Sequence, residues 1–159
     1  MRCELPSSPT QVLIAGLLEI GGLIAMRIVP IARNVGTANV TEWAKLALSD
    51  LRARVLRVTR IRLDDQDRPF ALEKVILVLE RFPGLEGDSG TIADIGELAL
   101  QYGLLLARTT ERISLVPAPA DVGAQLGLAM GADVLKLDRV VETADGIPVE
   151  WRTTFSRAQ

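Results

Sequence analysis

Two segments near the end of the chain, 132–143 and 147–157, alternate apolar and polar residues, and Ala144-Asp145-Gly146 joins them. An Asp-Gly pair between two such segments is a strong hairpin signal, because glycine tolerates the positive φ of a tight turn. Alternation in the second segment predicts a packing face made of Ile147, Val149, Trp151, Thr153 and Phe155. The opposite face then carries Pro148, Glu150, Arg152, Thr154 and Ser156. We expect a ligand on this second face, because it presents a carboxylate, a guanidinium and two hydroxyls in a row.

Three further segments have the pattern of strands, namely 54–63, 70–79 and 104–116. Helix signals lie between them. Asn39 and Glu42 have the spacing of a capping box, which predicts a helix that ends near Asp50. A short helix is predicted over 120–126, stopping at Gly127.

A third helix is predicted to begin at Thr91, with Asp94 three residues later and Gly103 suited to the position just after the helix. Its apolar stripe consists of Ile92, Ile95, Ala99 and Tyr102. Few helices and several long strands with hairpin turns indicate an α+β fold with a mainly antiparallel sheet.

The first part of the chain is less regular. Residues 1–10 are expected to be a leader or linker remnant, and 11–29 fit either a helix or a buried strand. The run 12–29 is apolar, but Glu19 and Arg27 interrupt it, so we interpret it as core rather than a membrane span. We therefore divide the chain into 1–28, which includes a possible first element, and a ligand-binding domain over 29–159.

The composition excludes several kinds of functional site. The chain has 159 residues, a net charge of −2 and no histidine, and its pI is about 5.2. Without histidine and with Cys3 as the lone cysteine, the usual zinc sites, Ser-His or Cys-His nucleophile pairs and internal disulfides are excluded. We expect no metal, no cofactor and no catalytic residue. The acidic balance gives no general attraction to nucleic acid. The single cysteine fits a reducing compartment, so a cytoplasmic location is expected.

The chemistry that remains is anion recognition. Arg60 and Arg62 share one strand face and can hold a phosphate or carboxylate in forked hydrogen bonds, although a solvated strand face is the alternative. Glu73 lies in an apolar row and needs a partner, either one of these arginines or a ligand hydroxyl. Glu150 accepts hydrogen bonds from a ligand or faces solvent. The helix start at Thr91 offers free backbone N–H groups.

Several of these residues form a pattern that resembles a known family. The pattern contains 57–62, Arg68-Pro69 and Glu73, then Thr91-Ile92-Ala93 before a helix that ends at Tyr102-Gly103. It continues with the LG turn of 124–131, an apolar strand ending in Arg139, and Asp145-Gly146-Ile147-Pro148-Val149-Glu150. In order and spacing this resembles the UTRA domain, the effector-binding half of HutC-type GntR transcription regulators, over roughly residues 30–157.

The resemblance implies a chorismate-lyase-like fold, which is a mainly antiparallel sheet flanked by helices that binds a small effector between sheet and helices. It implies that Arg60 and Arg62 grip an anion, that Thr91 supplies a hydroxyl, and that Glu73 and Glu150 supply carboxylates. Ser156 stands six residues after Glu150, where many members have tyrosine. Thr91 replaces a serine, and alanine follows at 93 where tyrosine is common, so a ligand other than a sugar phosphate is expected.

Three functions are compatible with these observations. The first is a ligand-sensing, homodimeric module of a GntR-type regulator that binds a small anionic or polar effector and reaches DNA only through an N-terminal domain outside this chain. The chain is then either the effector half of a longer regulator or a stand-alone sensor. The second is a lyase acting on chorismate, although Phe70-Ala71-Leu72 replaces that enzyme's tryptophan–alanine–arginine stretch. The third is a structural dimerisation domain.

Overall fold

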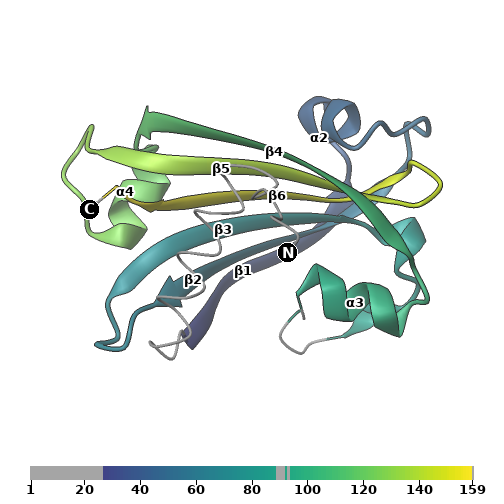
Figure 1. Ribbon diagram of the computed structural model, residues 1–159, viewed down its shortest axis with the longest axis horizontal. Coiled ribbons are helices and arrows are strands. Elements are labelled where there is room, and N and C mark those ends of the chain that lie inside the picture. Colours follow the sequence, from purple (N-terminus) through teal and green to yellow (C-terminus); the bar gives the residue numbers. More distant parts are fainter. Residues whose placement is uncertain (1–26, 89–91, 93, 159) are drawn as a thin grey trace, which may run out of the picture.

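A single antiparallel sheet organises the chain (Figure 1). The computed structural model describes residues 27–88, 92 and 94–158. Within them, six strands pair in the order β1-β2-β3-β6-β5-β4, every neighbouring pair antiparallel. Their bounds are Arg27–Thr37 (β1), Arg54–Leu63 (β2), Pro69–Val78 (β3), Leu106–Pro117 (β4), Asp133–Thr143 (β5) and Pro148–Arg157 (β6).

Short helices lie at the two ends of this sheet. Figure 1 shows α2 and α3 near one end and α4 near the other. The helices span Val40–Lys45 (α2), Ile95–Gln101 (α3) and Ala120–Leu126 (α4), and two 3₁₀ turns span Leu79–Arg81 (η1) and Leu85–Gly87 (η2). The expected α+β architecture is therefore confirmed.

Two helix boundaries differ from the sequence prediction. α2 has the predicted capping box, because Asn39 accepts from the Glu42 backbone and Glu42 accepts from the Asn39 backbone. It ends at Lys45 rather than near Asp50, because Ala47 has a φ of 48°, outside the helical region. α3 begins at Ile95 with Asp94 at its N-cap, so the predicted start at Thr91 is wrong. Thr91 itself lies outside the described residues.

Strand β1 was not predicted as a strand. Its first three residues belong to the ambiguous stretch 11–29, whose earlier part lies outside the described residues. Pro30 lies within β1, which is an edge strand, the position in a sheet where proline is tolerated. The register with β2 shifts between Pro30 and Ala32. The division of the chain at residue 28 stays a prediction.

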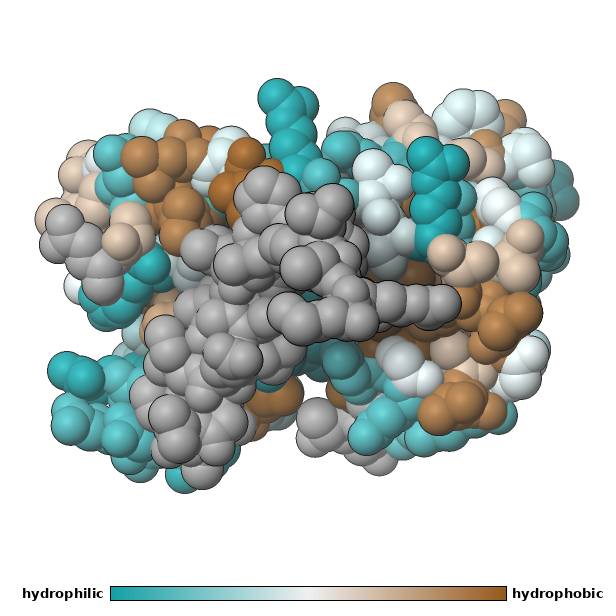
Figure 2. All heavy atoms as spheres, viewed as in Figure 1, coloured by the Kyte–Doolittle hydropathy of each residue, from teal (hydrophilic) through white to brown (hydrophobic). Residues whose placement is uncertain are grey.

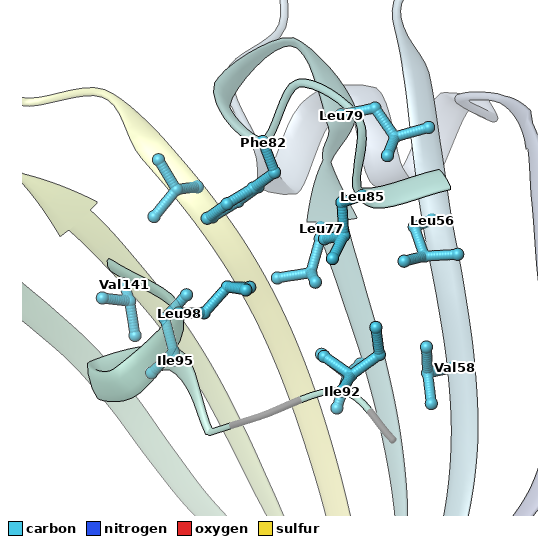
Figure 3. Close-up of a cluster of buried hydrophobic side chains, with 12 residues drawn as sticks. Leu56, Val58, Leu77, Leu79, Phe82, Leu85, Ile92, Ile95, Leu98 and Val141 are labelled. Atoms are coloured by element: carbon cyan, nitrogen blue, oxygen red, sulfur yellow. The ribbon is translucent and has the colours of Figure 1, made fainter. Parts of the chain in front are cut away.

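The two faces of the sheet carry different hydrophobic clusters. One face packs under α3 and the 3₁₀ turns, as Figure 3 shows. That cluster consists of Leu56, Val58, Val75, Leu77, Leu79, Phe82, Leu85, Ile92, Ile95, Leu98, Val141 and Val149. On the other face α4 packs through Val122 and Leu126 against Phe155, and α2 packs through Leu46 against Val55.

Val149 corrects the simple alternation that we predicted for β6. Glu142 pairs with Pro148 but Val141 pairs with Glu150, so Val149 is an extra residue at a register shift. It packs in the α3-side cluster, whereas Trp151 packs beside the α2 cluster. Beyond the shift the predicted alternation holds, because Glu150, Arg152, Thr154 and Ser156 pair with alternate residues of β3.

Hydrophobic and hydrophilic side chains are mixed on the face of the molecule that Figure 2 shows. Figure 2 shows, outside its grey atoms, hydrophobic side chains in several separate groups between hydrophilic ones. The most exposed large hydrophobic side chains among the described residues include Val40, Leu51, Leu100, Leu105 and Met130. Helices, loops and turns carry these residues, so the sheet centre remains the main buried region.

Candidate functional site

A buried carboxylate, Glu73, lies at the centre of the sheet on the face covered by α3. Its residue is 3% exposed. Arg60 donates from Nε to Glu73 Oε1 at 3.1 Å, and Arg62 donates from Nε to the same oxygen at 2.6 Å. Arg152 Nη1 and Thr154 Oγ1 donate to Oε2 at 3.5 and 3.4 Å. Strand register explains this convergence, because Arg60, Glu73 and Thr154 pair directly across β2, β3 and β6.

A second buried carboxylate, Glu150, extends the site toward β5. It is 1% exposed, and it accepts from Arg139 Nη2 at 3.0 Å and from Arg152 Nη2 at 3.1 Å. Arg152 therefore bridges Glu73 and Glu150, and it also donates to Asp94 at 2.8 Å. We call these residues the charged network: Arg60, Arg62, Glu73, Asp94, Arg139, Glu150 and Arg152.

The surrounding packing holds the charged network in place. Val58 of β2 and Val75 of β3 belong to the hydrophobic cluster beside it. Ile92 packs into the same cluster, and its backbone oxygen accepts from Arg60 Nη1 at 3.2 Å. The network is thus bounded by the sheet on one side and by residues just before α3 on the other.

Electrostatics keep these groups charged. Burial would raise the pKa of Glu73, but the positive charges of Arg152, Arg62 and Arg60 outweigh it and hold that pKa below its usual value. The pKa of Asp94 is lowered in the same way by Arg152 against the effect of burial. Burial alone would lower the pKa of Arg152, but Glu150, Glu73 and Asp94 raise it. Glu73 and Asp94 are therefore ionised at neutral pH and are not suited to donating protons.

The structure brings together five of the residues that we singled out: Arg60, Arg62, Glu73, Glu150 and Arg152. The alternative of a solvated strand face is wrong for Arg60, which is 3% exposed, and a solvent-facing Glu150 is equally wrong. Of the two partners predicted for Glu73, the structure shows the arginines, because Glu73 forms ion pairs with Arg60 and Arg62.

Of the remaining two predicted residues, only Ser156 is among those that the structure describes. Ser156 is buried on the same face, two positions beyond Thr154, but none of the hydrogen bonds among the described residues joins it to these charges. Thr91 lies outside the described residues. The helix start that we expected to bind an anion has a carboxylate instead, because Asp94 occupies the N-cap of α3.

The sequence analysis did not name Arg139 or Asp94 as site residues, although both belong to the charged network. Arg139 pairs with Arg152 across β5 and β6 only because of the extra residue Val149. Counting back from the tight turn would place Arg139 opposite Trp151, on the other face. Asp94 was considered only as part of a helix start, and no local signal indicates its ion pair with Arg152, 58 residues away.

The described part of the chain has neither a membrane-spanning helix nor a metal-binding cluster. None of its helices is long and apolar enough to cross a membrane. None of its groups of acidic and cysteine side chains has the arrangement of a metal site.

The fold and the buried charges together define an α+β binding domain built on one antiparallel sheet. Comparison with family models identifies it more closely, because the UTRA domain model matches residues 31–159. The chain belongs to the UTRA domain family.

Relatives and solved structures agree with this family. The HTH-type transcriptional regulator Rv0792c of Mycobacterium tuberculosis is 34% identical over 95 residues, which are 57% of this chain and 35% of that protein. This chain therefore spans about a third of that curated relative. The family and this relative support a ligand-binding regulatory domain of a GntR-type regulator and do not favour the lyase.

Two crystal structures show the same fold. The effector domain of PhnF from Mycobacterium smegmatis is 24% identical with a TM-score of 0.78, over 87% of this chain and 84% of that one. A GntR-family transcriptional regulator from Enterococcus faecalis V583 is 22% identical with a TM-score of 0.72, over 83% of this chain and 94% of that one. The expected antiparallel α+β fold of this family is thus confirmed.

Proposed function

We propose that this chain is the effector-sensing domain of a GntR-type transcription regulator and that it is not an enzyme. The observation that carries the proposal is the charged network in the middle of a UTRA-type sheet. Arginines and carboxylates that are buried together stabilise a fold poorly compared with apolar packing. Retaining them in the sheet centre is explained by recognition of a polar or anionic small molecule.

The proposed ligand-binding residues are Arg60, Arg62, Glu73, Thr91, Glu150, Arg152 and Ser156. Arg60 and Arg62 are held by Glu73, and Glu150 holds Arg152, so the guanidinium groups are oriented before a ligand arrives. Such preorganisation reduces the entropy lost on binding. The hydroxyls of Thr91 and Ser156 would complete the recognition of polar groups on the effector.

The regulator acts by coupling this site to DNA binding. An effector that binds one arrangement of the domain more tightly shifts the population toward that arrangement, and linkage carries the change to the DNA-binding state. DNA contact is made by a separate N-terminal winged-helix domain, since the net charge of −2 gives this chain no general attraction to phosphates. The domain works as a homodimer in the cytoplasm.

A thermal-shift screen tests the proposal. The purified chain is heated with sugar phosphates, amino acids and aromatic carboxylates, each in excess. A ligand at a hundredfold excess over its Kd stabilises the folded state by about 2.7 kcal/mol, which moves the melting temperature by several degrees. We expect at least one saturable hit.

Two matched variants locate the hit. Arg152→Lys keeps the charge but loses the fork that contacts Glu73, Glu150 and Asp94, so the ligand-induced shift should fall strongly. Arg112→Lys makes the same chemical change at an exposed position of β4 and should leave the shift unchanged. A screen without hits would argue for the structural dimerisation domain, and a hit that both variants bind equally would place the ligand away from the charged network. Turnover of chorismate would instead support the alternative that the chain is a lyase.

A further inference from the structure

Arg139 and Arg152 form a pair with unused hydrogen-bond donors. They lie directly opposite each other on β5 and β6. Their Nη2 atoms donate to the two different oxygens of Glu150, which holds the two guanidinium groups side by side. Their Nε atoms, however, are buried and have no hydrogen-bond partner among the described residues.

Two such orphaned donors in one place require an explanation. Nearly all buried polar groups in proteins have a partner, and a charged donor without one is especially costly. All other buried side-chain nitrogen and oxygen atoms of the described residues, Glu73 and Glu150 included, have partners. The missing acceptor is therefore specific to this arginine pair.

The charge balance limits what that acceptor is. The charged network joins four arginines to three carboxylates, of which Glu73 and Glu150 are buried and Asp94 is 63% exposed. Glu111 of β4 pairs in register with Arg139 and adds a negative charge beside it. The site thus offers at most one unit of positive charge. A doubly charged phosphate ester would leave an uncompensated buried charge, which is strongly unfavourable.

We infer that the effector is a singly charged carboxylate and that its two oxygens accept from Nε of Arg139 and Nε of Arg152. This makes Arg139 a specificity-determining residue of the site. Two single N–H donors match the two oxygens of a carboxylate. The inference rests on the proposed function and narrows its ligand class. Because protein covers both Nε atoms, the carboxylate is enclosed, and the side chains over it shift as it enters.

The test uses nuclear magnetic resonance of the arginine Nε–H groups, which report directly on the proposed donors. The ¹⁵N-labelled chain is titrated with two matched pairs of probes, benzoate against phenyl phosphate and acetate against methyl phosphate. Arg139→Lys and Arg152→Lys assign the two signals, and Arg112→Lys assigns an exposed arginine of β4 as the control.

We expect both carboxylates to shift the Arg139 and Arg152 signals and leave the Arg112 signal in place. Within each pair the carboxylate should bind at least about tenfold more tightly than the phosphate ester. Arg139→Lys, which keeps the charge but lacks Nε–H, should lose most of this preference.

Other results overturn the inference. Tighter binding of the phosphate esters, carboxylate shifts confined to other arginines, or an unchanged preference in Arg139→Lys would each do so. If none of the four probes binds, while the wider thermal-shift screen still finds a ligand dependent on Arg152, the carboxylate inference fails and the sensor function stands. If that screen is also empty, both fail.

Discussion

Replacing Glu73 by glutamine tests whether the charged network is held together by its central carboxylate. Glutamine preserves the size of the side chain but removes the negative charge. Three arginines then lose a counter-charge, and two of them are almost fully buried, since the Arg60 and Arg152 side chains are 3% and 8% exposed. Removing one partner of a buried pair costs about 3–5 kcal/mol. That is a large part of the roughly 5–15 kcal/mol that stabilises a typical domain.

A matched control uses the same substitution in an exposed pair. Glu86 lies 2.9 Å from Arg54, but the two side chains are 46% and 54% exposed. Exposed pairs contribute about 0–1 kcal/mol, so Glu86→Gln should scarcely change the stability.

Urea unfolding followed by tryptophan fluorescence measures both variants. With a urea dependence of about 1–3 kcal/mol per molar, Glu73→Gln should lower the midpoint by more than about 1 M. If Glu73→Gln costs no more than Glu86→Gln, the buried pairs do not stabilise the sheet centre and our reasoning is refuted.

The pH dependence gives a second check on Glu73. Burial would raise its pKa, but Arg152, Arg62 and Arg60 hold the folded-state pKa below the unfolded value of about 4.3. The unfolded chain therefore binds more protons between these two values, and stability rises with pH across that window. The stability difference between the natural chain and Glu73→Gln should be full at about pH 7 and shrink below about pH 4. An equal difference at about pH 3 and pH 7 would contradict the lowered pKa.

Three other substitutions have defined expectations. Gly36→Ala places a Cβ 2.8 Å from Arg57 Nη1, which must leave its hydrogen bond to Asn34, so the free energy of unfolding should fall by up to about 1 kcal/mol. Gly87→Ala, with open space around it, should not weaken the fold. Asn39→Ala removes the capping box of α2 and should cost about 1 kcal/mol, measured by urea unfolding together with faster amide exchange in α2. Leu126→Ala truncates a fully buried side chain under the sheet and should lower the free energy of unfolding by about 2–5 kcal/mol. A smaller loss, measured by calorimetry, would show that neighbouring side chains move into the cavity.

The elements that the sequence predicted best are those whose signals are local. The bounds of β2 and α4 agree with the prediction, and β3 differs by one residue at each end. Alternation, the capping box at Asn39 and the glycines after α3 and α4 depend on residues that are close in the chain. Long-range packing is not needed to recognise them.

The prediction failed where a local pattern was interrupted. β1 was not identified, because its first three residues lie in the stretch 11–29, which fits either a helix or a buried strand, and Pro30 follows directly. An acidic residue three positions after a threonine suggested a helix start at Thr91, but Asp94 is used as the N-cap and as a partner of Arg152. Both failures concern positions whose role depends on distant neighbours.

The sequence by itself determined that Arg60 shares a strand face with Arg62, and that Glu150 shares one with Arg152, because side chains alternate with a period of two. Only the tertiary structure decided that these faces meet. β3 pairs with β6, which brings Glu73 to Arg152 across 79 residues, and the extra residue in β6 turns Arg139 toward the same site. Strand order and bulges depend on how separate segments pack together, and no local pattern contains that information.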